Sequence, residues 1–406
     1  MSQNKVVLAF SGGLDTSFCV PYLIDKGYEV HTLFVNTGGV NDDKCQQIES
    51  RALQLGAKQH WQVDAQQMLW EEIITPLVWG NSKYQGQYPL LCADRYLIAK
   101  ESIKLCQQLG TNIVAHGCTG MGNDQVRFDI SIKALGDYTI LSPIRDIQQQ
   151  VKDVRNYEIK YLQDKGFETS TEHKKYSINE NLLGVTVSGC EIDQWQEPQD
   201  DTYVLTNHYQ NFPQQSQKLI LEFIKGEVVA VNGQKMAGVE IMQLLNKTLG
   251  QYGVGRGIYT GDTVIGLKGR IVFEAPALFG LLKAHQAIEE VVLTQWQNQF
   301  KPQVAEKWTE LVYKGFYFDP LSNDLHQFLA STQSHVNGSV ELLVYPGQLQ
   351  VVAVNAPTIL STKDACYAQS ASWGIQEAVG FIQLYGNSTA IWAKVKQEQQ
   401  EREGAA

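Results

Sequence analysis

The sequence predicts an α/β protein in which a parallel-sheet domain is followed by an α+β domain and a C-terminal helix. In the first half, short runs that are apolar throughout alternate with amphipathic stretches, which is typical of parallel strands covered on both faces. In the second half, tight-turn signals such as Asn232-Gly233 separate runs of alternating polarity, a pattern that favours hairpins. These two observations set the fold class.

The first half is expected to alternate strands and helices. The predicted strands are residues 6–10, 29–35, 59–63, 112–116 and 138–141. Amphipathic periodicity predicts helices at residues 16–26, 42–55, 66–77, 93–109 and 123–135, and Pro21 is expected to kink the first of them. Ligands of parallel sheets bind beyond the carboxyl ends of the strands, so we expect the loops after Phe10, Val35 and His116 on one rim.

The second half begins after a polar stretch at residues 166–175, and we expect domains at residues 1–168, 169–385 and 386–406. Residues 197–217, rich in Gln, Asp and Pro, predict a surface excursion. Strands are predicted at residues 219–224, 227–231, 339–345 and 350–354, and helices at 237–249, 276–300 and 304–313. Residues 388–402 predict a polar helix whose apolar stripe is expected to dock on a partner subunit, and this stripe comprises Ile391, Trp392 and Val395.

Composition excludes several classes of protein. The 406 residues carry a net charge of −10, and basic side chains drive most nucleic-acid affinity, so a nucleic-acid partner is disfavoured. The 7 cysteines are odd in number and contain no C-x-x-C pair, which disfavours a disulfide framework and a structural zinc site, and no metal site is predicted. No apolar run reaches the roughly 18 residues of a membrane span, and the N-terminal run is too short for a signal peptide. We therefore expect a cytoplasmic protein without membrane contact.

The segment directly after the first predicted strand carries the strongest chemical signal. It runs through the opening of the first helix and reads Ala9-Phe10-Ser11-Gly12-Gly13-Leu14-Asp15-Thr16-Ser17. Its glycines let the backbone turn sharply, its hydroxyls add donors, and the exposed amides of a helix start favour an anion. It is neither a Walker loop nor a G-x-G-x-x-G turn. The string predicts a phosphate site, with a glycine turn capped by Asp15 or Thr16 as the alternative.

A second segment follows the fourth predicted strand and opens a helix. It reads Ala115-His116-Gly117-Cys118-Thr119-Gly120-Met121-Gly122-Asn123-Asp124-Gln125-Val126-Arg127-Phe128. Asp124 and Arg127 are three residues apart and share a helix face. Arg127 can clamp a carboxylate through two hydrogen bonds, and Asp124 can accept from an ammonium group. The pair suits an amino-acid substrate, whereas a capped helix start with a surface ion pair is the alternative.

Both segments resemble known families. The first resembles the S-G-G-x-D-[ST]-S signature of the N-type ATP pyrophosphatases, which cleave ATP between the α- and β-phosphates. The second resembles the H-G-x-T-G-x-G-N-D-Q-V-R-F stretch of argininosuccinate synthase. Further matches run from residue 5 to about 385, and they are Tyr88-Pro89-Leu90, Leu97-Ile98-Ala99-Lys100, Tyr176-Ser177-Ile178-Asn179-Glu180-Asn181-Leu182, Tyr252-Gly253-Val254-Gly255-Arg256 and Glu310-Leu311-Val312-Tyr313-Lys314-Gly315-Phe316.

The resemblance implies a ligase that joins L-citrulline and L-aspartate in arginine biosynthesis. The ureido oxygen of citrulline attacks the α-phosphorus of ATP, pyrophosphate leaves, and the aspartate amine then displaces AMP from citrullyl-AMP. Residues 9–17 would hold ATP, with Val35 near the adenine and Gly117 against the nucleotide. Mg²⁺ would be carried by the ATP phosphates, and the protein would be a homotetramer.

The resemblance also assigns the amino-acid substrates to individual side chains. Aspartate would contact Thr119, Asn123 and Asp124. Citrulline would contact Tyr88, Asn123, Arg127, Ser177 and Thr186, the last of which stands where the family usually has a serine. Asp124 and Arg127 are the expected catalytic residues, and Asp124 is a weak candidate for the base that takes the proton of the aspartate amine.

Three positions depart from the family pattern. Ala93, Gly261 and Phe273 stand where the family has a serine, a substrate-binding glutamate and a tyrosine. Either other groups such as Asp262 grip citrulline, or the ureido substrate is an N-acylated citrulline that lacks the ammonium group. Two further alternatives are a tRNA-thiolating transferase and a non-catalytic ATP-binding protein. The first usually needs a cysteine pair to accept sulfur, whereas Cys118 stands alone near the expected rim.

Overall fold

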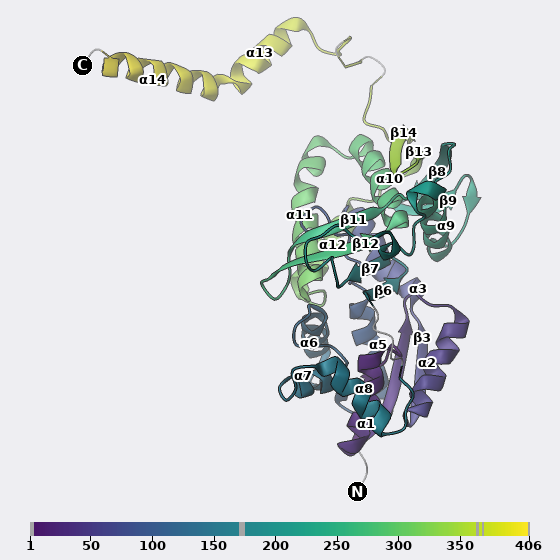
Figure 1. Ribbon diagram of the computed structural model, residues 1–406. Coiled ribbons are helices and arrows are strands. Elements are labelled where there is room, and N and C mark those ends of the chain that lie inside the picture. The colour runs from purple at the N-terminus through teal and green to yellow at the C-terminus, as the bar shows by residue number, and fades with distance from the viewer. Residues whose placement is uncertain (1–3, 170–174, 363–364, 368, 405–406) are drawn as a thin grey trace. The chain divides into compact units, whose positions relative to one another are not determined.

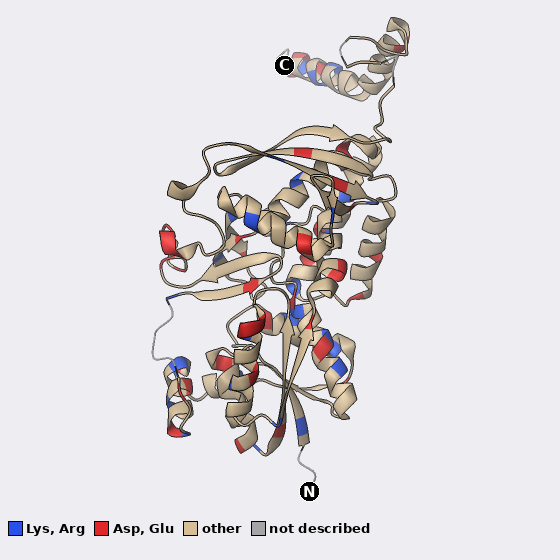
Figure 2. Ribbon diagram, turned by 90° about the vertical axis from the view of Figure 1, so that its right-hand side faces the viewer, with Lys and Arg blue, Asp and Glu red and all other residues tan. Residues whose placement is uncertain are grey.

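The computed structural model describes residues 4–169, 175–362, 365–367 and 369–404. The chain forms two compact units, Met1–Thr358 and Ile359–Ala406, and each is considered by itself (Figure 1). The predicted domain boundary at residues 166–175 lies partly outside the described residues. In both units, basic and acidic residues are interspersed along the ribbon (Figure 2).

A parallel sheet forms the N-terminal part of the first unit (Figure 1). Its strand order is β3-β2-β1-β4-β5, and its strands are β1 (Asn4–Ala9), β2 (Tyr28–Asn36), β3 (Gln59–Asp64), β4 (Ile113–Ala115) and β5 (Thr139–Leu141). Val7 of β1 lies opposite His31 of β2 on one side and Val114 of β4 on the other. The predicted strands are confirmed, with ends that differ by at most two residues.

Helices cover both faces of this sheet because successive side chains of a strand point to opposite faces. Val6 and Leu8 of β1 pack with helices α1 (Leu14–Asp25), α2 (Asp42–Gln54), α7 (Pro143–Gln148) and α8 (Val154–Asp164). Val7 packs on the other face with α5 (Arg95–Leu109) and α6 (Asp124–Leu135). Helices α7 and α8 are additional to the predicted set, and α1 continues past Pro21.

The prediction of one α-helix over residues 66–77 is wrong in its middle. The segment forms α3 (Gln66–Leu69), a π-helical turn η1 (Trp70–Ile74) and α4 (Thr75–Trp79). Pro76 has no N–H group and cannot donate to the carbonyl of Glu72, so the regular α pattern is interrupted. The hydroxyl of Tyr317 donates to that carbonyl instead, at 3.1 Å.

The rest of the first unit is α+β, as predicted. One antiparallel sheet has the order β10-β9-β8-β13-β14 and the other β11-β12-β7-β6. Their strands are β6 (Ser177–Asn181), β7 (Gly184–Ser188), β8 (Gln217–Ile224), β9 (Glu227–Val231), β10 (Gln234–Lys235), β11 (Arg256–Asp262), β12 (Lys268–Glu274), β13 (Gly338–Tyr345) and β14 (Gln348–Asn355). Two single-turn 3₁₀ helices, η2 (Asp200–Thr202) and η3 (Tyr209–Asn211), lie in the predicted surface excursion.

The helices of this part are α9 (Gly238–Gln251), α10 (Pro276–Val292), α11 (Gln295–Lys314) and α12 (Pro320–Ser331). The predicted helices at residues 276–300 and 304–313 are therefore wrong in their boundary. The hydroxyl of Thr294 accepts from the Gln297 N–H at 3.3 Å, and Gln297 Oε1 accepts from the Thr294 N–H at 3.0 Å. This reciprocal cap starts a new helix at Gln295, and that helix continues through Pro302.

The two halves of the first unit share one apolar core. Leu77 of α4 and Tyr96 of α5 belong to the same buried cluster as Leu281 of α10 and Trp308 of α11. Segments of the N-terminal half are therefore packed directly against the helices of the second half. Side chains that reach a common site can come from both.

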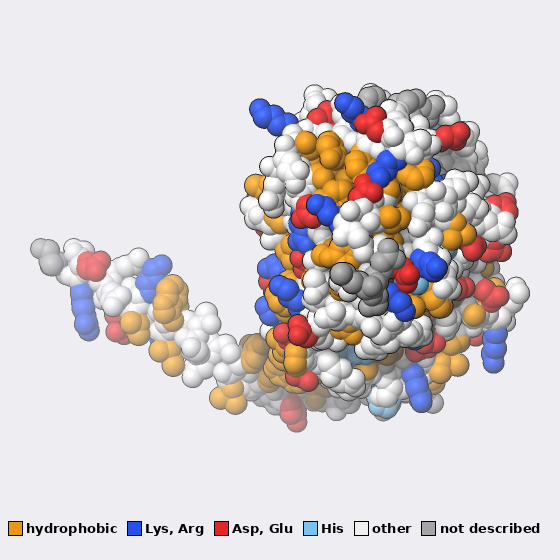
Figure 3. Space-filling model, turned by 90° about the horizontal axis from the view of Figure 1, so that it is seen from below, with side chains coloured by type: hydrophobic (Ala, Val, Ile, Leu, Met, Phe, Trp, Pro, Cys, Tyr) orange, Lys and Arg blue, Asp and Glu red, His pale blue; other side chains and the backbone are white. Residues whose placement is uncertain are grey.

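The second unit contains α13 (Ile375–Tyr385) and α14 (Asn387–Gly404), which confirms the predicted C-terminal helix. Hydrophobic side chains lie exposed along this segment (Figure 3), and Trp392 is 63% exposed. In the part of the chain that the structure describes, no helix combines the length and apolarity needed to cross a membrane.

Candidate active site

The start of α1 presents backbone N–H groups at the predicted phosphate site, whereas the N–H groups of Ser11 and Gly13 in the preceding loop donate to the hydroxyls of Thr16 and Ser11. Gly12 adopts a φ of 74°, which an L side chain rarely tolerates, and Gly13 is the N-cap of α1. No side chain of the described residues caps this helix start, so its first amides face outward to a ligand. The hydroxyls of Ser11 and Thr16 lie 3.2 Å apart beside them. Backbone and hydroxyl donors therefore converge at one helix N-terminus, which suits a polyphosphate.

The second glycine-rich segment lies directly against this loop. A Cβ added to Gly117 would be 3.0 Å from Cγ2 of Thr16 and 3.3 Å from its backbone nitrogen. A side chain at position 117 would therefore force the two turns slightly apart. The contact brings the turn after β4 onto the first turn of α1. Val35 lies buried near the carboxyl end of β2, which is the strand beside β1.

Asp124, at the start of α6, lies between two arginines. Its Oδ1 accepts from Arg127 Nη1 at 2.7 Å, and its Oδ2 accepts from Arg95 Nε at 3.1 Å. Burial would raise the pKa of Asp124, but Arg95 and Arg127 outweigh that effect and hold the pKa below its usual range. The carboxylate is ionised and accepts hydrogen bonds, so it is a poor general base. Its chemistry is that of an anion that orients donors.

Arg95 extends this network to two further elements. Its Nη1 donates to Oδ1 of Asp94 at 2.7 Å, and its Nη2 donates to Oδ1 of Asn179 in β6 at 3.2 Å. Asp94 also accepts from the hydroxyl of Thr37, which follows β2, at 3.2 Å. One buried guanidinium thus connects α5, α6 and the β6–β7 hairpin. The resulting set of charges is internally balanced: Arg95 and Arg127 against Asp94 and Asp124.

Asn123 and Arg127 connect α6 to the second half of the unit. Asn123 Oδ1 accepts from the backbone N–H of Val264 at 3.0 Å, in the loop between β11 and β12. Arg127 Nε donates to the carbonyl of Tyr313 at 3.0 Å, and the guanidinium carbon lies 4.9 Å from the centre of the Tyr313 ring. These contacts place both side chains where the two halves meet.

Aromatic side chains line the other side of the same region. Tyr84 stacks on Tyr313 with ring centres 3.6 Å apart, and Tyr88 lies edge-on to Phe273 at 5.7 Å. Tyr259 joins them, 5.7 Å from Tyr88 between ring centres. Burial raises the pKa of the Tyr88 hydroxyl well above its ordinary value. These rings offer shape and neutral hydrogen-bonding groups rather than charge.

The remaining predicted citrulline residues lie on the β6–β7 hairpin. Thr186 of β7 lies opposite Phe273 of β12 and opposite Asn179 of β6. Ser177 is exposed at the start of β6, and its side chain makes no hydrogen bond within the described residues. The structure therefore brings Thr186 beside Phe273 and beside Asn179, which accepts from Arg95, while Ser177 is exposed on the same hairpin.

The departure at Gly261 has a direct structural correlate. A Cβ at this position would lie 2.2 Å from Gln85 Oε1 and 2.5 Å from the Tyr259 hydroxyl. Gln85 Oε1 accepts from that hydroxyl at 2.9 Å, and Gln85 Nε2 donates to Oδ2 of Asp262 at 2.7 Å. Asp262 also forms an ion pair with Lys268. Gln85 and Tyr259 thus occupy the space that a larger residue at 261 would need, and the charge of Asp262 is already balanced.

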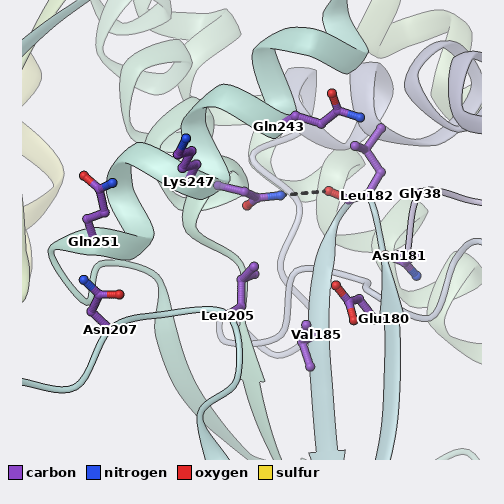
Figure 4. Close-up of a pocket in the computed structure, with 11 residues that line it drawn as sticks. Gly38, Glu180, Asn181, Leu182, Val185, Leu205, Asn207, Gln243, Lys247 and Gln251 are labelled. Carbon is purple, nitrogen blue, oxygen red and sulfur yellow. Dashed lines mark hydrogen bonds between the residues drawn. The ribbon is translucent and has the colours of Figure 1, made fainter. Parts of the chain in front are cut away.

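Two other features of the region are distinct from the predicted contacts. A cavity of about 430 Å³ opens beside Gly38, between the β6–β7 hairpin and α9. In Figure 4, Gln243, Lys247 and Gln251 of α9 line it together with Glu180 and Asn181 of β6. None of the predicted site residues lines this cavity. Within the described ranges, no group of three or more His, Cys, Asp or Glu is arranged to hold a metal ion.

Sequence reasoning missed four side chains that complete the site: Arg95, Tyr313, Asn179 and Gln85. A signal existed for Arg95, because it lies two residues before the matched Leu97-Ile98-Ala99 region, where the resembled motif also carries an arginine. Tyr313 and Asn179 lie inside matched segments without an assigned role. Gln85 had no signal, since its part depends on the absence of a side chain at Gly261.

Comparison with known proteins agrees with these features. A family model for the arginosuccinate synthase N-terminal HUP domain matches residues 5–168, and one for the arginosuccinate synthase C-terminal domain matches residues 176–392. An argininosuccinate synthase of Xanthomonas campestris pv. campestris is 55% identical over 97% of this chain and 100% of its own length. One of Xylella fastidiosa is 53% identical over 97% of this chain and 98% of its own length. Among solved structures, a 4-thiouridine synthetase in complex with RNA and ATP aligns at 15% identity with a TM-score of 0.30, covering 39% of this chain and 42% of its own.

Proposed function

Because the chain belongs to the argininosuccinate synthase family, we propose that it forms argininosuccinate from L-citrulline and L-aspartate while ATP is cleaved to AMP and pyrophosphate. The observation that carries this proposal is the contact of Gly117 with Thr16. It sets a phosphate-binding turn against the segment that leads into Asn123, Asp124 and Arg127. A nucleotide and two amino acids can then meet at the boundary between the two halves of the unit.

ATP occupies the loop at residues 9–17. The amides of the first turn of α1 meet the phosphates, and the hydroxyls of Ser11 and Thr16 add donors. Val35 lies near the adenine, and Gly117 packs against the nucleotide. Mg²⁺ enters as part of the substrate, bound to the ATP phosphates. Catalysis of this kind of transfer depends mainly on positioning and charge stabilisation.

Aspartate binds through Thr119, Asn123 and Asp124. The ionised Asp124 faces the amine of aspartate, which must be placed in line with the adenylated carbon before it displaces AMP. Arg95 and Arg127 already balance the charge of this carboxylate, so it attracts the amine without holding it as a tightly paired ammonium. Asp124 therefore orients the nucleophile, and the proton leaves to another acceptor.

Citrulline binds through Tyr88, Asn123, Arg127 and Thr186, with Ser177 at the edge of the pocket. Arg127 uses Nε and Nη1 within the protein, which leaves Nη2 for the substrate. The guanidinium stabilises the charge that develops when the ureido oxygen attacks the α-phosphorus. Arg127 is thus the electrostatic residue of the first step, and Asp124 the orienting residue of the second.

The protein acts in the cytoplasm as a homotetramer in this proposal. The support for assembly is the exposed apolar stripe of α14, in which Ile391, Trp392 and Val395 are each about half exposed or more. Contact with a partner subunit would cover these side chains. Light scattering of the full chain tests this point, because it predicts four copies.

An N-acylated citrulline is a second candidate substrate, and the filled space at Gly261 favours it. The side chains next to this position are Gln85 and Tyr259, which are neutral, and the nearby Asp262 is paired with Lys268. An amide nitrogen needs an acceptor but no counter-charge. Such a substrate would fit a pocket in which the family's glutamate is missing.

The test compares L-citrulline with N-acetyl-L-citrulline in the presence of Mg-ATP and L-aspartate. AMP, pyrophosphate and the ligated product are measured by mass spectrometry. Equal amounts of AMP and argininosuccinate from L-citrulline are expected. Turnover of the acetylated compound alone assigns the specificity to the region of Gly261, and absence of product with both contradicts the proposal.

The same assay separates the other classes of protein. Stabilisation by ATP without release of AMP would indicate a binding protein. A tRNA-thiolating enzyme would need a reactive sulfur, but burial raises the pKa of the Cys118 thiol well above its ordinary value. We therefore expect no retardation of tRNA in a native gel.

A further inference from the structure

A buried histidine fixes the turn that follows β4. His116 is 1% exposed and stacks on Phe128, with ring centres 5.5 Å apart. Both of its ring nitrogens have partners. Nδ1 lies 3.2 Å from the backbone nitrogen of Cys118, and Nε2 lies 2.8 Å from Oδ1 of Asp129 on α6. The side chain therefore bridges the turn and the helix that carries Asp124.

These partners determine which ring nitrogen carries the proton. The backbone N–H of Cys118 can only donate, so Nδ1 of His116 must accept. The hydrogen is then on Nε2, which donates to Asp129. If both ring nitrogens carried a proton, the Nδ1–H group would face the N–H group of Cys118, and two donors cannot form a hydrogen bond with each other. The arrangement selects one neutral tautomer.

Asp129 is itself held in place as an acceptor. Arg145 of α7 donates through Nη1 to Oδ2 of Asp129 at 2.7 Å. Burial would raise the pKa of Asp129, but the hydrogen bonds from His116 and Arg145 hold it below its usual range. Arg145 thus holds the Asp129 carboxylate in place, and this carboxylate in turn holds the ring of His116.

The turn has little freedom once His116 is in place. Ser142 donates to the carbonyl of Cys118 at 3.1 Å, and Gln148 Oε1 accepts from the N–H of Gly120 at 2.7 Å. Gly117, the residue in close contact with Thr16, directly precedes Cys118. Loss of the hydrogen bond from the Cys118 N–H to His116 would free the end of the turn that contacts the proposed ATP loop at residues 9–17.

We propose that His116 is a positioning residue, which holds residues 117–119 against the ATP loop through the Nε2–H tautomer that Asp129 fixes. The inference rests on the proposed function, in which Gly117 contacts the nucleotide and Thr119 contacts aspartate. His116 touches neither substrate and acts through the turn.

Two substitutions separate the hydrogen bond from the packing. His116→Phe keeps the ring stacked on Phe128 but removes both hydrogen bonds. His116→Asn supplies an acceptor for the N–H two residues further on, as in an Asx-turn. We expect kcat/KM for ATP and for aspartate to fall about 30-fold in H116F and to recover to within about fivefold in H116N, with the KM for citrulline changed by less than about threefold.

The control is His285→Phe, which removes another fully buried histidine, on α10. It is expected to lower Tm without a selective change in the constants for ATP and aspartate. Any of three results would overturn the inference. The first is unchanged kcat/KM values in H116F, and the second is an equal fall of kcat/KM in H116N and H116F at similar Tm. The third is an equal loss for ATP, aspartate and citrulline.

Two further measurements keep the test decisive. If H116F does not fold, Asp129→Asn removes the charge that fixes the tautomer, and a fall of about threefold or more in the same two constants is expected; no change contradicts the inference. The Tm increase caused by Mg-ATP is also measured for wild type, H116F and H116N. A wild type without turnover counts against the proposed function, whereas an undiminished ATP-induced Tm increase in H116F counts against the role of His116.

Discussion

The two sides of the site are built from different kinds of interaction. On the side of α6, Asp124 lies half-buried between Arg95 and Arg127, and each of its oxygens accepts from a guanidinium. On the opposite side, Tyr88, Phe273 and their neighbours offer rings and neutral groups. The charged side depends on complete pairing, because an unpaired buried charge is costly. The aromatic side depends on shape, so single changes there are better tolerated.

The largest effect is expected from Asp124→Ala, which leaves two buried arginines without their shared partner. Because the Asp124 side chain is 35% exposed, solvent screens part of this loss, and we expect the free energy of unfolding to fall by about 1–3 kcal/mol. Aspartate-dependent AMP formation should be abolished, and Tm should fall. Asp124→Asn keeps the shape and removes the charge, and it should be nearly as inactive with a smaller loss of Tm. Near-normal turnover of D124A would remove Asp124 from the site.

Arg95→Met is the next largest change and tests a residue that the sequence did not single out. It preserves the aliphatic packing but removes the donors to Asp124, Asp94 and Asn179. We expect kcat/KM for aspartate to fall by about 100-fold, since Asp124 loses one of the two arginines that orient its carboxylate. Arg95→Lys should recover little, because an ammonium group cannot serve three acceptors with a planar fork. Full activity of R95K would show that charge alone suffices.

Glu158→Gln contrasts an unpaired buried carboxyl with the paired Asp124. Glu158 of α8 is 1% exposed, and its Oε1 has no hydrogen-bond partner in the described residues. Burial, with Asp15 nearby, raises the pKa of Glu158 to about 8. Ionisation is thus disfavoured in the folded state, so wild-type stability declines as pH rises from about 4.5 toward 8.

E158Q lacks this titration. We expect its stability relative to wild type to increase by about 4 kcal/mol between pH 5 and pH 9, an order-of-magnitude value. Thermal unfolding of both proteins across this range measures the difference. A stability difference that does not change with pH would show that Glu158 has the same pKa in the folded and the unfolded protein.

The smallest effect is expected from Tyr313→Phe on the aromatic side. The ring keeps its stacking on Tyr84 and its place beside Arg127, and only the hydroxyl that accepts from Asn123 at 3.4 Å is removed. We expect the KM for citrulline to rise by about fivefold or less, with less than about 1 kcal/mol of lost stability. A loss as large as that of R95M would show that the two sides do not differ in tolerance.

The sequence predicted the parts of this structure that are local. The loop at residues 9–17, the turn containing Gly117 and the helix with Asp124 are each contiguous strings with clear turn and helix signals. The strands of the parallel sheet followed from apolar runs, whereas their order in the sheet was not predicted. The π-helical turn at 70–74 could not be predicted, because it depends on Pro76 together with the hydroxyl of the distant Tyr317. The separation of α10 from α11 was readable from Thr294 and Gln297, but the continuous apolar pattern obscured it.

Contacts between distant segments were beyond local patterns. Arg127 meets the carbonyl of Tyr313, a residue 186 positions away. Gln85 can lie beside Gly261 only because this position has no side chain, and no sequence motif indicates such a contact. The neutral tautomer of His116 follows from a backbone donor and a carboxylate that converge only in the fold. The Asp124–Arg127 pair was therefore predictable from its spacing on one helix, whereas the pairing of Asp124 with Arg95 was not.

The central claim is that the ureido oxygen of citrulline is transferred to AMP. L-Citrulline labelled with ¹⁸O in the ureido group, supplied with Mg-ATP and L-aspartate, tests it directly. The account predicts one ¹⁸O atom in each AMP released, none in pyrophosphate, and argininosuccinate without the label. Label in pyrophosphate, or unlabelled AMP formed together with argininosuccinate, would contradict it.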